Sequence, residues 1–186
     1  MGSHPSSFRR EVREALDALR RIVQALRASS RDIERRVGLS SAQLFALHQL
    51  SGSPGASVND LAAQTFTHQS SVSVVVQRLV KRRLVAKATA PGDKRRVALR
   101  LTGSGRALVR RSPEPMQDRL IAGISSLNDD ERHVLTRALN DIAATMGHDD
   151  EQPPMLFEDR RRRASRKRAR RAARPSRGRP SRSGRA

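Results

Sequence analysis

The carboxyl-terminal stretch of the sequence most constrains what this chain can fold into. Residues 160–186 contain 14 Lys or Arg residues, no Asp or Glu, and no Val, Ile, Leu, Met or Phe. Because such a composition cannot form a core, we expect a disordered tail over residues 148–186, Arg-rich from 160. Residues 1–159 hold the other 24 basic groups and all 18 acidic groups, so the folded part is only moderately basic.

Charge and composition narrow the class of partner. A formal charge of +20 attracts polyanions and favours nucleic acid over an anionic membrane. The chain has no cysteine, which excludes disulfides and thiol-based sensing. We find no apolar run near the roughly eighteen residues that span a bilayer, and no signal-peptide core. We therefore expect a cytoplasmic, nucleoid-associated protein with no membrane partner.

Helical patterns occupy both ends of the expected domain, which we place at residues 8–147. Apolar residues spaced by three and four predict an amphipathic helix over 8–29. Further helices are expected over 103–147, with a break at Pro113 and Pro115. The apolar stripe of the first helix needs a later element or a second copy to cover it, which favours dimerisation. Residues 1–7 are expected to be disordered or a leftover of expression.

Residues 40–102 predict a compact lobe between these helices. Two capping boxes, Ser40 with Gln43 and Ser57 with Asp60, each begin a short helix. A third helix is expected to begin with Thr67 as its cap and to run to Lys81. Two short strands over 84–90 and 96–101 follow, separated by the turn residues 91–95.

Short helices followed by a hairpin predict a winged helix-turn-helix: a mainly α fold with a small β-hairpin wing. A major groove about 12 Å wide admits one helix, here the third, and a cationic hairpin tip suits phosphates or the minor groove. The alternative for the third helix is an ordinary core helix whose polar side faces water. The candidate DNA-binding residues are Thr67, Gln69, Ser70, Ser73, Val74, Gln77, Arg78, Lys81, Lys94, Arg95 and Arg96, of which Val74 would meet a thymine methyl and Arg78 and Lys81 would hold phosphates.

The sequence resembles the MarR family of bacterial transcriptional regulators over residues 8–147. The residues that carry the resemblance are Asp93, Arg95, Leu101, Thr102 and Gly105 of the wing pattern D-x-R-x-x-x-x-x-L-T-x-x-G, with Leu39, Ser40, Gln43, Leu61 and Ala62 in the preceding helices. The resemblance implies a homodimer built by helices 8–29 and 103–147, with Arg95 reaching a minor groove and Asp93 holding the wing. It also implies a small-molecule effector pocket, which here would depend on aliphatic residues and Arg.

One departure from the family has a structural consequence. Relatives usually carry Gly in the segment L-E-x-x-G-L that leaves the recognition helix, but here Arg83 precedes Leu84. A left-handed conformation at Arg83 would cost on the order of 1 kcal/mol relative to Gly.

These patterns predict a sequence-specific, ligand-responsive repressor that binds a pseudo-palindromic operator as a homodimer. The alternative is a low-specificity architectural protein of the nucleoid, dominated by its basic tail. That tail is expected to neutralise phosphates without reading bases. The alternatives are a solvated extension and the misread end of a GC-rich gene. Scattered histidines, no cysteine and no phosphate loop or nucleophile motif predict no metal, no cofactor and no enzyme activity.

Overall fold

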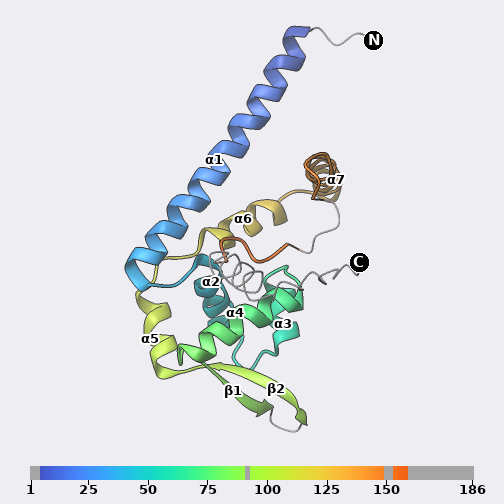
Figure 1. The fold of residues 1–186 in the computed structure, drawn as a ribbon. Helices are drawn as coiled ribbons and strands as arrows, with labels where there is room; N and C mark the ends of the chain where they lie inside the picture. The colour runs from blue at the N-terminus through green and yellow to red at the C-terminus, as the bar shows by residue number, and fades with distance from the viewer. Residues whose placement is uncertain (1–4, 91–92, 149–152, 159–186) are drawn as a thin grey trace, which may run out of the picture.

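The structure, a computed structural model, describes residues 5–90, 93–148 and 153–158, without the side chains of residues 5, 90 and 93–96. It is mainly helical, with one antiparallel hairpin, as the sequence predicts (Figure 1). The elements are α1 (Pro5–Val37), α2 (Ser41–Gly52), α3 (Val58–Gln64), α4 (Gln69–Lys81), β1 (Val85–Ala90), β2 (Asp93–Leu101), α5 (Gly103–Arg111), α6 (Met116–Ser125) and α7 (Asp129–Thr145).

The lobe formed by α2 to α5 holds most of the apolar core. Both predicted capping boxes are present: the Ser40 hydroxyl accepts from the Gln43 amide, and the Ser57 hydroxyl accepts from the Asp60 amide. These caps fix where the helices begin, so their apolar residues face one another. The fully buried side chains of this core include Leu44, Leu47, Leu50, Leu61, Val72, Val75, Leu79 and Leu99.

The hairpin wing is longer than predicted on its second strand. Val85 pairs with Leu101, and the register stays regular to Thr89 opposite Val97. Ala90 then pairs with Asp93, so the pairing is irregular at the tip and β2 begins at Asp93 rather than at Arg96. The α2–α3 loop joins the other edge of β2, because the Gly55 amide donates to the Leu99 carbonyl. The wing is thereby tied to the helices of the lobe.

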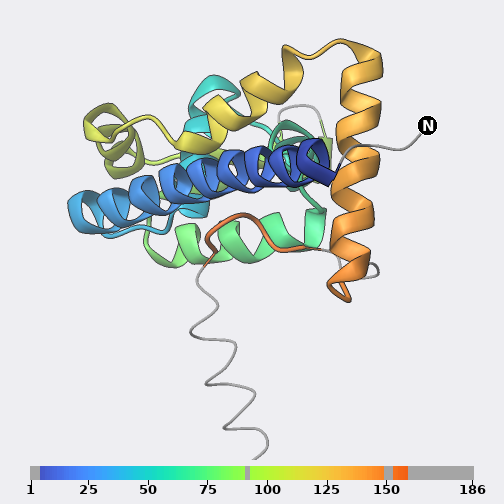
Figure 2. The same cartoon turned by 90° about the horizontal axis from the view of Figure 1, so that it is seen from above.

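The first helix projects away from the lobe. It extends from Pro5 to Val37, beyond the predicted range of 8–29, so residues 5–7 are helical rather than disordered. Gly38, with φ +65°, follows the last turn and ends the helix. Figures 1 and 2 show α1 as a long arm and α7 standing apart from the lobe.

Two features mark the rest of the chain. Pro113 and Pro115 separate α5 from α6, as predicted, and Pro115 precedes the first residue of α6. The prediction that residues 153–158 are disordered is wrong: this segment packs against the lobe, and Met155 is only 4% exposed. We name residues 153–158 the C-terminal strap. Figures 1 and 2 show it running alongside α4.

Candidate nucleic-acid interface

The helix α4 presents a polar stripe opposite its buried apolar face. Val72, Val75, Val76 and Leu79 face the core, at the helical spacing of three and four. Because β-branched residues are modest helix formers, this helix depends on that packing. Of the predicted DNA-binding residues on α4, the structure leaves Gln69, Ser70, Val74, Gln77 and Lys81 exposed and Ser73 and Arg78 half-buried.

The predicted cap of α4 is wrong by one residue. The N-cap is His68, whose side chain makes no capping hydrogen bond, and the Thr67 hydroxyl instead donates to the Thr65 carbonyl at 2.9 Å. Phe66 precedes it with φ +49° and is 76% exposed. The tight turn from α3 therefore holds the Thr67 hydroxyl in a local bond. Thr67 is half-buried, before the first turn of α4.

Arg78 differs from the other predicted contacts because it already has a partner. Its Nη1 lies 3.2 Å from Oε1 of Glu158 in the C-terminal strap, and its side chain is 28% exposed. Lys81, in the last turn, is exposed. Of the two residues predicted to hold phosphates, Lys81 is thus exposed to solvent, whereas Arg78 is already paired with Glu158.

The wing tip was predicted to supply Lys94, Arg95 and Arg96, with Asp93 holding the turn. Their backbones belong to β2, but their side chains lie outside the part of the chain that the structure describes. The base of the wing is well defined. The Thr102 hydroxyl accepts from the Gly105 amide at 3.0 Å and donates to the Arg83 carbonyl at 2.8 Å. This bond network joins the end of α4 to the start of α5.

The left-handed conformation considered for Arg83 is present, with φ +57°. The Arg83 amide donates to the Val80 carbonyl, and the Leu84 amide donates to the Leu79 carbonyl, which closes the last turn of α4. A non-glycine residue therefore occupies a position that favours glycine.

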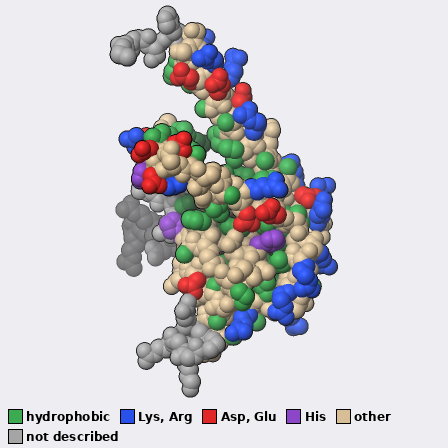
Figure 3. Space-filling view, turned by 180° about the vertical axis from the view of Figure 1, so that it is seen from behind, with side chains coloured by type: hydrophobic (Ala, Val, Ile, Leu, Met, Phe, Trp, Pro, Cys, Tyr) green, Lys and Arg blue, Asp and Glu red, His purple; other side chains and the backbone are tan. Residues whose placement is uncertain are grey.

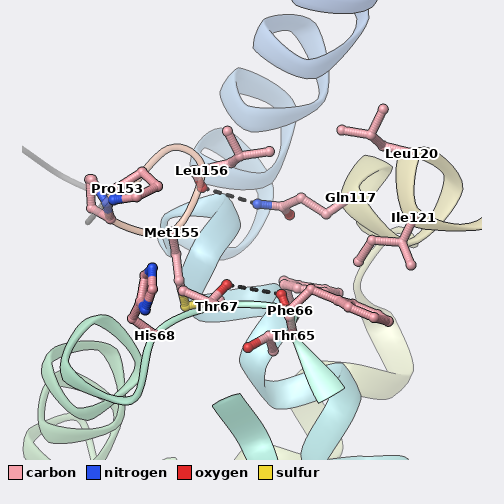
Figure 4. A pocket seen from close by; sticks show the side chains of 12 residues that line it. Thr65, Phe66, Thr67, His68, Gln117, Leu120, Ile121, Pro153, Met155 and Leu156 are labelled. Carbon is pink, nitrogen blue, oxygen red and sulfur yellow. Dashed lines mark hydrogen bonds between the residues drawn. The ribbon is translucent and has the colours of Figure 1, made fainter. Parts of the chain in front are cut away.

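A pocket of about 260 Å³ lies where α2, α6, the turn before α4 and the C-terminal strap meet (Figure 4). Gln117 is 4% exposed there; its amide donates to the Leu156 carbonyl at 3.0 Å and its oxygen accepts from the Ser41 hydroxyl at 2.9 Å. No Arg is among the described lining residues, in contrast to the expectation from sequence. They are Phe45, Thr65, Phe66, Thr67, His68, Gln117, Leu120, Ile121, Pro153, Pro154, Met155 and Leu156.

A second polar contact holds α6 on α2. The Gln49 amide donates to Asp118 at 2.8 Å, and Nε2 of neighbouring His48 is buried with no hydrogen-bond partner in the described residues. Burial lowers the pKa of His48, against the opposite effect of Asp118 and Glu114. Burial also raises the pKa of Asp118, while His48 and the bond from Gln49 oppose that rise. Desolvation is thus the largest cause of the pKa shift at both His48 and Asp118.

Lys and Arg side chains gather over α5 and the end of α1, as Figure 3 shows. The last turns of these helices contribute Arg35, Arg36, Arg110 and Arg111. In the described residues, no cluster of His, Asp and Glu could hold a metal ion, and no helix is long and apolar enough to cross a membrane.

The sequence profile of the MarR family matches residues 37–96, which span α2, α3, α4 and the hairpin to its tip. Over these residues the chain is similar to the MarR family. This match supports a DNA-binding regulator of transcription with a winged-helix lobe.

Solved structures similar to this chain include three of known source. Bordetella bronchiseptica BpsR, in a study of how 6-hydroxynicotinic acid regulates its DNA binding, is 29% identical (70% of this chain, 98% of that chain, TM-score 0.46). Wild-type MarR from E. coli is 20% identical (68% and 94%, TM-score 0.47). A point mutant of S. aureus MepR, bound to an oligodeoxyribonucleotide, is 19% identical (71% and 97%, TM-score 0.45). A search of curated proteins finds no match.

Sequence reasoning missed the C-terminal strap. The only local signal was the apolar triplet of Met155, Leu156 and Phe157, between an acidic stretch and the Arg-rich run. Phe66 was also missed as an exposed residue of the pocket. Both belong to the surroundings of α4 rather than to its polar stripe.

Proposed function

We propose that this protein is a homodimeric, sequence-specific repressor of the MarR type that inserts α4 into the major groove. The observation that carries the proposal is the exposed polar stripe of α4 on a lobe whose other helices and wing brace it. Amide and hydroxyl side chains such as Gln69, Ser70 and Gln77 donate to and accept from base edges. Lys81 contacts a phosphate, and Arg95 at the wing tip reaches the adjacent minor groove.

The dimer is built by the arms. In the single chain, α1 exposes a stripe that includes Val12, Leu16 and Leu19, and α7 exposes Val134 and Ile142. Apolar stripes of this length on projecting helices are covered by a second copy in stable proteins. A two-fold dimer places two α4 helices about one turn of DNA apart, so the operator is pseudo-palindromic. Occupying a promoter in this way represses transcription by blocking polymerase.

The pocket makes the protein responsive to a small molecule. Its walls combine the apolar side chains of Phe45, Leu120 and Ile121 with the polar groups of Gln117 and His68. This combination suits a small ligand with an apolar body and one or two hydrogen-bonding groups. Since Thr67 and His68 precede α4 directly, a ligand there alters the position of that helix.

Selection of duplexes from a random pool, followed by footprinting, tests the proposal. We expect a pseudo-palindrome, bound at least about a thousandfold more tightly than random duplex at physiological salt. Gln69→Ala and Gln77→Ala should each lower the affinity for the selected duplex about tenfold or more and relax the preference at one position. Gln24→Ala, the same substitution at an exposed position on α1, is the control. Unchanged selectivity in both α4 variants would show that α4 does not read the sequence.

The tail supports a second candidate, a low-specificity architectural role. Its 14 basic residues without an acid can bind any duplex through phosphates. A chain that ends at residue 159 should lose affinity for all duplexes alike, with a smaller salt dependence, while operator preference survives. Loss of the preference itself, or a specific-to-random ratio near one in the full chain, would favour the architectural role.

A further inference from the structure

The C-terminal strap is a built part of the fold. Met155 inserts into the lobe core, and the Leu156 carbonyl accepts from the buried amide of Gln117 at 3.0 Å. The Glu158 amide donates to the Met155 carbonyl at 3.1 Å, which closes a turn. Figure 4 shows Met155 and Leu156 on one side of the pocket, opposite the turn that leads into α4. The strap therefore contacts both the pocket and the recognition helix.

Two side chains of α4 hold the strap. The Ser71 hydroxyl donates to the Pro153 carbonyl at 3.4 Å, and Arg78 pairs with Glu158 at 3.2 Å. Ser71 and Arg78 are seven residues apart, which is nearly two full helical turns, so both lie on the same side of α4. The Glu158 side chain is only 10% exposed. The strap thus follows one flank of α4 over most of its length.

This flank is the one that a phosphate backbone would occupy beside the inserted helix. An α-helix with its side chains is about 10–12 Å across, and the major groove is about 12 Å wide. A second segment packed against the flank makes the helix too wide for that groove. Glu158 also places a negative charge where phosphates approach and takes up the guanidinium of Arg78 that would bind one.

We propose that the C-terminal strap is an autoinhibitory element: it covers the Arg78 flank of α4 and must leave that flank before α4 can enter DNA. The inference rests on the proposed function of α4 as the recognition helix. Release frees Arg78 for a phosphate and removes Glu158 from the groove wall. Because the strap also lines the pocket, a ligand that binds in the pocket would change how readily the strap releases Arg78.

The test is a double-mutant cycle on the full chain, with a duplex selected by the wild-type protein as the probe. Glu158→Gln should tighten binding about threefold to fivefold, the scale of one partly exposed ion pair. It should also steepen the dependence of log K on log salt by about 0.9, because Arg78 then neutralises one more phosphate. Glu14→Gln makes the same charge change on the polar face of α1 and should leave the affinity unchanged.

The variant Arg78→Ala separates the strap from the proposed function. It should weaken binding, and Glu158→Gln should then tighten binding less than it does in the wild-type background. If Arg78→Ala weakens binding but Glu158→Gln does not tighten it, the autoinhibitory strap is overturned and the role of α4 stands. If Glu158→Gln increases the affinity equally in the wild-type and Arg78→Ala backgrounds, the strap does not act by holding Arg78, and the proposal is overturned. If neither Arg78→Ala nor the α4 glutamine variants change binding, the proposed function itself fails.

Hydrogen exchange gives a second measurement that needs no substitution. The Glu158 amide is bonded to the Met155 carbonyl when the strap is in place, so its exchange rate reports on the strap. Saturating the full chain with the selected duplex should speed exchange at residues 155–158. Exchange that stays the same or becomes slower on binding would overturn the proposal, because the strap would then remain seated beside DNA-bound α4.

Discussion

Adding a single methyl group at Gly105 should destabilise the protein, although it lies in a helix where alanine is normally favoured. A Cβ at this position would lie 2.2 Å from the Leu84 carbonyl oxygen and 3.2 Å from the carbonyl carbon. The Leu84 carbonyl oxygen accepts from the Thr102 amide at 3.0 Å, and the Thr102 hydroxyl caps α5, the helix that contains Gly105. The obstruction is therefore backbone that hydrogen bonds hold on both sides.

The size of the effect follows from these contacts. To reach an ordinary separation, Leu84 and α5 must move apart by about 1 Å, and overpacking of this kind costs about 1–3 kcal/mol. Weakening the Thr102 bonds adds about 1 kcal/mol. The helical preference of alanine over glycine returns about 0.5–1 kcal/mol. The Gly105→Ala variant should thus lose about 2 kcal/mol of unfolding free energy, the opposite sign to that expected from propensity alone.

Urea unfolding followed by far-UV circular dichroism measures this change, since the chain has no Trp or Tyr for fluorescence. With a slope of about 2 kcal/mol per molar urea, the midpoint should fall by about 1 M. All variants are compared at one protein concentration, because the stability of the proposed dimer would depend on it. Gly103→Ala adds the same methyl in the same turn with no atom within 4 Å and should be neutral or slightly stabilising. A Gly105→Ala midpoint equal to or above the wild-type value would refute the steric reasoning.

Three further experiments test other features of the molecule. Arg83→Gly should be about 1 kcal/mol more stable than Arg83→Ala in urea unfolding, because both lose the same side chain and only glycine relieves φ +57°; equal stabilities would contradict the strain. Burial lowers the pKa of His48, so the neutral imidazole contributes to the free energy of unfolding at neutral pH, and this contribution is lost as the pH falls below the usual histidine pKa near 6.5. The urea midpoint of the wild-type protein should therefore fall with pH in this range, and His48→Gln should make that fall smaller. An equal pH dependence in His48→Gln would exclude His48 as the cause. Leu19→Asp, in the exposed stripe of α1, should yield a helical monomer in analytical ultracentrifugation while Arg21→Ala remains a dimer; a dimeric Leu19→Asp would place the interface elsewhere.

The lobe could be predicted from sequence because its elements are set by local rules. The Ser40 and Ser57 capping boxes each join residues three apart, so their spacing in the chain is enough to identify them. The same holds for the break at Pro113 and Pro115. The polar stripe of α4 followed from helical periodicity, and the structure places it on the surface.

The beginning of α4 was less predictable because the backbone turn before the helix decides which residue is the N-cap. Thr67 is a good N-cap by type, yet its hydroxyl donates back to the Thr65 carbonyl, and the helix begins after His68. The left-handed turn at Phe66 brings Thr67 into that position. A non-glycine residue at positive φ cannot be read from residue type, since the surrounding fold imposes it.

The C-terminal strap could not be predicted because everything that holds it is distant in sequence, and this gives a final prediction on where the folded unit ends. A chain that ends at residue 152 loses the burial of Met155, about 1.5–3 kcal/mol, and leaves the buried amide of Gln117 without its acceptor, about 1–3 kcal/mol. A chain that ends at residue 159 keeps both contacts and should unfold within about 0.5 kcal/mol of the full chain. Far-UV circular dichroism in urea separates the two truncations, and equal midpoints would show that the strap is no part of the folded unit. The expected difference places the boundary of the domain after Glu158. The strap belongs to the domain because Met155 fills part of the lobe core, even though the residues that follow it are Arg-rich.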